Sequence, residues 1–136
     1  MFEAKYKALD GILRESDFNN RFLFTISGGY RFAKGWEAAA KFRFVGGRPY
    51  TAINPENGTQ FALDYNAARL PNYSRLDVRV DRRFNFKKWT LVTYIDVQDV
   101  WNQKNVTDFR WNKYTRKIEE DESIGILPTI GVNAIF

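Results

Sequence analysis

The residues of this chain that could do chemistry are carboxylates and arginines gathered on two short segments. Asp77 and Asp81 alternate with Arg75 and Arg79, and Asp96 lies on the next alternating segment. Paired carboxylates can act as general acid and base or bind a metal ion, but arginine stands between the first two here. The 136 residues include no His and no Cys, which removes the commonest general base and all thiol chemistry. The sequence therefore predicts no enzyme, no catalytic residues, and no metal or cofactor site.

The composition is that of a folded protein. Apolar residues make up 44% of the chain and aromatic residues 17%, too much for a disordered segment. The net charge of +5 is small enough to lie on ordinary solvated surface. No stretch approaches the ~18 apolar residues of a membrane-spanning helix, and residues 1–17 lack the apolar core of a signal peptide. Membrane-spanning strands alternate polar and apolar residues, so these tests do not detect them.

Alternation of apolar and polar residues with a period of two is the dominant pattern, and it predicts an all-β, antiparallel chain. The predicted strands lie at residues 22–32, 36–44, 75–84, 89–98 and 128–136. Residues 2–9 fit a strand or a short helix, and their alternation favours the strand. No other helix is predicted. Polar segments at residues 9–19, 51–72 and 102–122 are predicted to be loops. Short links at residues 33–35 and 85–88 join successive strands, and Gly35 is expected to take a positive φ.

Two other kinds of site have partial signals. The pairs Gly28-Gly29 and Gly46-Gly47 lie within or at the end of strands, where glycine marks a bend or bulge, so they are not interpreted as phosphate-binding loops. An RNA-binding sheet needs exposed aromatic residues among basic residues on one face. Here aromatic residues and arginines fall on opposite faces of the predicted strands, and no nucleic-acid partner is predicted.

The third predicted strand separates its charges from its apolar residues. Leu76, Val78 and Val80 alternate with the four charged residues from Arg75 to Asp81. In a soluble sheet the apolar face would pack in a core and the charged face would contact solvent, which accounts for this strand taken alone. In a membrane barrel the apolar face would contact lipid and the charged face would line the lumen.

The aromatic residues and the connection lengths favour the membrane barrel. Antiparallel pairing would gather aromatic residues beside the short links and at the opposite strand ends, as two girdles. The predicted girdle comprises Phe32, Trp36, Phe84, Trp89 and Trp101, with Phe22, Tyr50, Phe86 and Phe136 beside them. The predicted strands have the length of about 9–11 residues that a tilted membrane strand needs. Short and long connections alternate as in outer-membrane barrels, whereas two structureless loops of about 20 residues are unusual in a soluble domain.

Several segments, in order, resemble the C-terminal barrel region of TonB-dependent outer-membrane receptors. Residues 70–89 (LPNYSRLDVRVDRRFNFKKW) are similar to the family's loop exit, R-x-D strand, tight periplasmic turn and aromatic residue. Residues 18–51 resemble the family's preceding hairpin, and residues 95–106 resemble its next strand and loop entry. Residues 126–136 resemble its terminal strand. Together these cover about residues 18–136. The sequence departs from the family at Asp99, where Asn is common, and at Ala134, near the usual place of an aromatic residue.

This resemblance implies that residues 1–136 are the C-terminal part of a receptor barrel of about 22 strands. Five or six strands leave two open edges that cannot face lipid, so the chain is expected to be a truncated frame, gene fragment or excised piece without plug. The implied role is transport across the bacterial outer membrane, importing a large scarce ligand such as a siderophore or other metal chelate, cobalamin or a glycan. The implied partners are outer-membrane lipid, the rest of the receptor including its plug, the barrel assembly machinery, and TonB through the plug.

The resemblance also implies roles for residues on the predicted strands. A lumen-facing set would contact the plug or pair across strands, although a merely hydrated wall explains it equally well: Arg75, Asp77, Arg79, Asp81 and Asp96. An assembly signal would be formed by Ile130, Val132 and Phe136. The alternative function is that of a soluble small β-barrel or sandwich that binds an apolar ligand.

Overall fold

The computed structural model describes residues 3–136 and is all-β, with antiparallel sheets, as the alternation predicted. Its contacts divide the chain into two compact units. The sheet unit comprises Thr25–Arg43, Ser74–Gln103 and Ile124–Phe136. The loop unit comprises the described residues up to Phe24, together with Phe44–Tyr73 and Lys104–Ser123.

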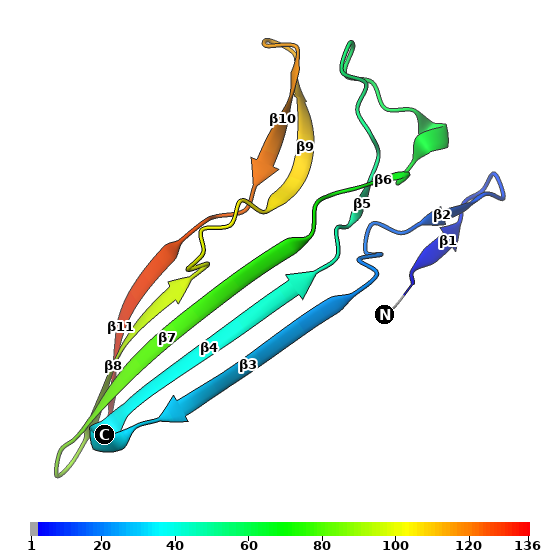
Figure 1. Cartoon of the computed structure of the whole chain (residues 1–136). Coiled ribbons are helices and arrows are strands. Elements are labelled where there is room, and N and C mark those ends of the chain that lie inside the picture. The colour runs from blue at the N-terminus through cyan, green and yellow to red at the C-terminus, as the bar shows by residue number, and fades with distance from the viewer. Residues whose placement is uncertain (1–2) are drawn as a thin grey trace. The chain divides into compact units, whose positions relative to one another are not determined.

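The sheet unit is built on one five-stranded, up-and-down sheet with the strand order β11-β8-β7-β4-β3 (Figure 1). Its strands are β3 (Leu23–Arg31), β4 (Trp36–Val45), β7 (Tyr73–Asn85), β8 (Thr90–Gln98) and β11 (Leu127–Ile135). These are the five strands that the alternation predicted between residues 22 and 136, and β7 is longer than predicted. The sheet does not close into a barrel, so β3 and β11 are open edges.

The short turns at one end of this sheet have specific backbone requirements. Ala33–Gly35 forms a single 3-10 turn, η1, in which Lys34 has φ 61° and Gly35 has φ 78°. A Cβ atom on Gly35 would lie 2.5 Å from the carbonyl oxygen of Arg83, so the position suits only glycine. The expectation of a positive φ at Gly35 is confirmed. In the turn between β7 and β8, the Phe86 N–H donates to the Trp89 carbonyl oxygen at 2.9 Å.

The loop unit contains three two-stranded pairs where the sequence predicted mostly loop. The pairs are β1 (Lys5–Lys7) with β2 (Leu13–Glu15), β5 (Pro49–Tyr50) with β6 (Ala68–Arg69), and β9 (Val106–Asn112) with β10 (Lys117–Glu122). A 3-10 turn, η2, spans Ala62–Asp64. The strand predicted within residues 2–9 is confirmed at Lys5–Lys7, and Phe2 lies outside the described residues. The loop predictions were wrong at β2, β6, β9 and β10, because these pairs are short or carry polar residues on both faces.

Hydrophobic burial is minimal in this fold. Among residues 3–136, Leu70 is the only buried hydrophobic residue, with 5% of its surface exposed. The buried polar residues are Asn19, Asn66, Asp99 and Asn105, and Gly46 and Pro49 are buried as well. Many large apolar side chains of the five-stranded sheet are exposed instead, and the others are half-buried. No helix within residues 3–136 is long and apolar enough to cross a membrane.

Candidate functional site on the five-stranded sheet

The register of the sheet separates its side chains into two faces. On one, Val80 lies opposite Ile95 and Ile95 lies opposite Ile130 across β7, β8 and β11. One residue back along β7, Arg79 lies opposite Asp96, whose other neighbour is Thr129. Because successive side chains of a strand point to opposite sides, these two rows belong to opposite faces. We call them the apolar face and the charged face.

Ion pairs on the charged face form along β7. Arg75 Nε lies 2.5 Å from Asp77 Oδ1, and Arg79 Nη2 lies 2.7 Å from Asp81 Oδ1. Each pair joins residues two apart, which share a face of the strand. Arg75 also reaches across to β8, where its Nη2 donates to Gln98 Oε1 at 2.6 Å. Each guanidinium therefore has an acidic partner on its own strand.

A tyrosine and a glycine complete the middle of the charged face. The guanidinium carbon of Arg79 lies 4.0 Å from the centre of the Tyr94 ring, which is cation–π distance. Gly131 on β11 is the register partner of Tyr94, and a Cβ atom there would overlap the tyrosine ring. The ring therefore covers a strand glycine while it supports the Arg79 guanidinium, a known way of stabilising glycine in a sheet.

A polar groove of about 590 Å³ runs over this face. Its small residues, Gly29 and Ala39, make room between charged neighbours. The charged and amide side chains that line it are Glu37, Lys41, Arg75, Asp77, Arg79, Asp96 and Gln98. Among residues 3–136 no three His, Cys, Asp or Glu side chains gather as a metal-ion site. The groove can hydrogen-bond to a polar surface, and its carboxylates mostly neutralise arginines.

The apolar face has exposed side chains on β7, β8 and β11, while Val78 and Val97 are half-buried. Ile130 and Val132 on β11 are 78% and 67% exposed, and Phe136 is 96% exposed. These three residues, predicted as an assembly signal, share one parity of the chain's last segment. On the neighbouring strands Ile95 and Val80 are also exposed. A continuous apolar surface with no covering element in the sheet unit requires an apolar environment or a partner.

Aromatic residues gather at the end of the sheet that carries η1 and the β7–β8 turn, which we call the short-turn end (Figure 1). Phe86 stacks on Trp89 with ring centres 4.5 Å apart, and Trp89 lies 6.1 Å from Phe136. Phe32 makes an edge contact with Tyr30 at 4.8 Å. Away from these turns, Trp101 lies 5.5 Å from Phe42.

Arg82 is a residue of the apolar face that the sequence analysis passed over. It follows Val78 and Val80 on the same parity of β7, and it precedes Phe84. Its guanidinium carbon lies 4.9 Å from the centre of the Trp36 ring and 5.2 Å from that of Phe84. Its Nη1 is buried and has no hydrogen-bond partner. The sequence does place Arg82 as a cation in the apolar row of β7, two residues before Phe84 of the predicted girdle.

Asp99 lies at the bend that follows β8. It is 1% exposed and has φ 50°, a left-handed conformation that few residues other than glycine, asparagine and aspartate adopt. Its backbone N–H donates to Asp77 Oδ1 at 3.1 Å, and its own Oδ1 accepts the N–H of Gln103 at 3.3 Å. Its Oδ2 is buried without a hydrogen-bond partner. An uncharged side chain of the same shape, with one oxygen to accept the Gln103 N–H, could therefore replace the Asp99 carboxylate.

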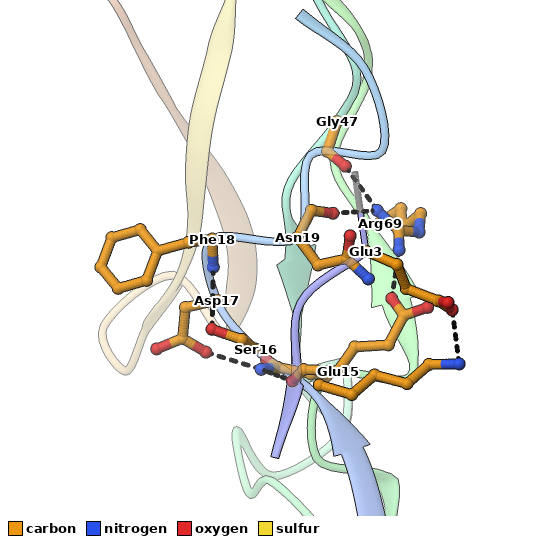
Figure 2. A network of polar contacts seen from close by, with 10 residues as sticks. Glu3, Glu15, Ser16, Asp17, Phe18, Asn19, Gly47 and Arg69 are labelled. Atoms are coloured by element: carbon orange, nitrogen blue, oxygen red, sulfur yellow. Dashed lines mark hydrogen bonds and ion pairs between the residues drawn. The ribbon is translucent and has the colours of Figure 1, made fainter. Parts of the chain in front are cut away.

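The loop unit is organised by a second polar cluster, centred on Arg69 (Figure 2). Arg69 Nη1 donates to the carbonyl oxygens of Asn19 at 2.7 Å and Gly47 at 2.9 Å. Its Nη2 forms an ion pair with the Glu15 carboxylate. One guanidinium thus joins three segments that are distant in sequence, which no local pattern indicates.

Asn66 extends this cluster. Its Nδ2 donates to the Glu15 carbonyl oxygen at 2.8 Å and to Asp17 Oδ1 at 2.6 Å. Asp17 also accepts the Tyr65 hydroxyl at 3.4 Å, and the negative charge of Asp17 raises the pKa of Tyr65. These contacts order segments predicted as loops, and they are structural in character.

No protein-family model, curated protein or solved structure matches this chain. The likeness to TonB-dependent receptors therefore stays an expectation from the order and spacing of its motifs.

Proposed function

We propose that this chain is a segment of an outer-membrane β-barrel, with the apolar face against lipid and the charged face toward the lumen. The observation that carries the proposal is the contrast between an exposed apolar face and a fold that buries Leu70 as its only hydrophobic residue within residues 3–136. A soluble domain of this length gains most of its stability from buried apolar surface. A membrane barrel instead places that surface in hydrocarbon.

The open edges support a larger assembly. Strands β3 and β11 each present unpaired backbone groups, and such groups are too costly to leave in lipid. Further strands must therefore pair with both edges. Since the first and fifth strands of an up-and-down sheet run in the same direction, the two edges cannot close on each other in an antiparallel barrel. The strands that complete the barrel come from outside this sheet.

The transport role follows from the same proposal together with the family likeness. We place this segment in a TonB-dependent receptor that imports a large scarce ligand, a metal chelate, cobalamin or a glycan. The polar groove on the charged face, with its paired arginines and carboxylates, is suited to hydrogen-bond to a plug or to a hydrated lumen. Chemistry within this chain is not required, because the energy for transport would arrive through the plug.

A fractionation experiment tests the proposal against the soluble alternative. The full chain should be insoluble in plain buffer and should gain sheet structure, seen by circular dichroism, only in detergent or lipid. In cells that produce the protein it should sediment with the outer membrane. A soluble monomer with full sheet content in plain buffer would contradict the proposal and favour a soluble binding module.

A further inference from the structure

We propose that the short-turn end of the sheet carries a binding site for the phosphate group of an anionic phospholipid, centred on Arg82. This inference rests on the proposed function, because it requires the apolar face to lie against lipid. The site consists of Arg82 with the rings of Trp36 and Phe84 beside it, and with Lys34, Lys87 and Lys88 on the two adjacent turns.

The geometry holds a positive charge in an apolar row. Ring centres lie 4.9 Å and 5.2 Å from the Arg82 guanidinium carbon, so Trp36 and Phe84 keep the group against the sheet. The side chain is half-buried, which leaves part of it open to the surroundings of the apolar face. Arg82 also lines a cavity on this face with Val80, Ile95 and Ile130. A cation in such a place is costly unless it finds an anion.

The described part of the chain supplies no such anion. None of the ion pairs within residues 3–136 includes Arg82, Lys34, Lys87 or Lys88. Glu37, the acidic residue at the start of β4, is already paired with Arg31 at 3.0 Å. The Nη1 of Arg82 has no hydrogen-bond partner, although arginine groups this covered are normally bonded. An anion that pairs with the Arg82 guanidinium must therefore come from outside residues 3–136.

The position of the site identifies the anion. Aromatic residues at the ends of membrane strands lie at the level of the lipid headgroups, and the short-turn end holds Trp36, Trp89 and Phe136. At that depth the available anion is a lipid phosphate, whose acyl chains would lie along the exposed apolar face. Basic side chains near a membrane surface attract anionic lipid, and arginine binds phosphate with directed hydrogen bonds.

Fluorescence quenching by brominated lipids tests this site. Trp36 is kept as the single tryptophan through the substitutions Trp89→Phe, Trp101→Phe and Trp111→Phe. The full chain is refolded in detergent micelles that contain dibrominated phosphatidylglycerol or, at the same mole fraction, dibrominated phosphatidylcholine. We expect the anionic lipid to be enriched about fivefold over the zwitterionic lipid at Trp36, the preference that one basic residue provides.

A matched pair of variants locates the effect. Arg82→Gln should lower the preference for phosphatidylglycerol about fivefold, to whatever the neighbouring lysines provide, while quenching by phosphatidylcholine persists and shows that the sheet still contacts lipid. Arg83→Gln removes the same charge from the next residue, on the opposite face, and should keep the preference. Equal quenching by both lipids in the unsubstituted chain, or equal losses in the two variants, would overturn the phosphate site and leave the membrane assignment standing. Absence of quenching by either lipid would contradict the proposed function itself.

Discussion

The sheet unit and the loop unit of this chain are stabilised by different interactions. The sheet unit relies on long strands in regular register, as in the nine consecutive pairs that join β11 to β8. The loop unit has strands as short as two residues, and its segments are joined by side chains such as Arg69 and Asn66 that bond to backbone carbonyl groups. Backbone pairing dominates one unit and individual polar side chains dominate the other.

This difference indicates how each unit should respond to substitution. In the sheet unit a single polar contact matters less than the environment of the whole apolar face. In the loop unit the half-buried side chain of Arg69 joins several segments, so its loss should open that unit while the sheet persists. The experiments below separate the two kinds of stabilisation.

Val78→Arg should have the largest effect. Val78 is paired with Val97 in the middle of the apolar row, so in the proposed barrel the new charge would face lipid. The free energy of unfolding in lipid bilayers of the complete barrel that contains this segment should fall by about 2–4 kcal/mol. Urea titration followed by tryptophan fluorescence measures it.

Trp89→Ala is the control for this prediction. In a membrane barrel it removes an aromatic residue at the short-turn end without opening a packed core, so it should cost less than Val78→Arg. In a soluble domain, emptying a core site of this size costs ~3–5 kcal/mol. If Trp89→Ala proves the more damaging substitution, the membrane assignment should be abandoned.

Arg69→Ala should open the loop unit. It removes hydrogen bonds to two carbonyl groups and leaves the Glu15 carboxylate without its ion pair. The local opening free energy should fall by about 1.5–3 kcal/mol, as expected for hydrogen bonds that involve a charged group. Hydrogen exchange should speed up at the amides of residues 15–19 and 66–70, with β7 and β8 unchanged.

Arg110→Ala provides the comparison within the same unit. Arg110 pairs with Asp121 at 3.0 Å, but its side chain is 67% exposed. Exposed ion pairs contribute about 0–1 kcal/mol to the free energy of unfolding. Exchange should therefore change little. If Arg69→Ala accelerated exchange uniformly in both units, the separate stabilisation of the loop unit would be wrong.

The same contrast explains what the sequence could reveal about the fold. The five long strands were predictable because their side chains alternate between two unlike environments over many residues. The hairpin of β9 and β10 was not, because Asp108 and Arg110 alternate with aromatic residues only briefly on β9, and β10 carries four acidic residues in succession at 119–122. The pairing of β5 with β6 spans only two residues, and the Arg69 side chain of β6 adds a bond to the carbonyl oxygen of Gly47, just before β5.

The candidate site was predictable to a similar degree. The alternation grouped the charges of β7 on one face, and the register brings Asp96 opposite Arg79. The alternation did not reveal that the ion pairs run along β7. Pairs along one strand and pairs between neighbouring strands both join residues of the same face, so they produce the same alternating pattern. Arg82 was missed because the apolar row was taken to pass from Val80 to Phe84, and its ring contacts depend on the neighbouring strand.

Asp99→Asn should stabilise the sheet unit. The amide would keep an oxygen to accept the Gln103 N–H and would tolerate the left-handed φ, while it removes a charge with an unpartnered oxygen beside Asp77. The free energy of unfolding should rise by about 1 kcal/mol, the low end of the cost of an unsatisfied buried group. The rise is small because the Nδ2 of the new asparagine has no evident acceptor. Asp96→Asn, which removes the same charge from the charged face, should give no such gain in a urea titration. Destabilisation by Asp99→Asn would show that the carboxylate has a partner.

The smallest effect concerns pH and the turn between β1 and β2. Asp10 accepts hydrogen bonds from the Arg14 guanidinium at 2.9 Å and the Ile12 N–H at 3.0 Å, and these lower the pKa of Asp10 from 3.8 to about 2. A pKa that is lower in the folded state stabilises the fold above the unfolded value, and this contribution is lost as the pH falls from about 4 to about 2. Because Asp10 is exposed, its contribution to the stability of the chain should be slight, so the direct measurement is a carbon-13 NMR titration of its carboxyl group. Arg14→Gln should raise the midpoint toward 3.8, whereas Arg110→Gln should leave it unchanged. An unshifted midpoint in the Arg14→Gln protein would show that this hydrogen bond does not persist in solution.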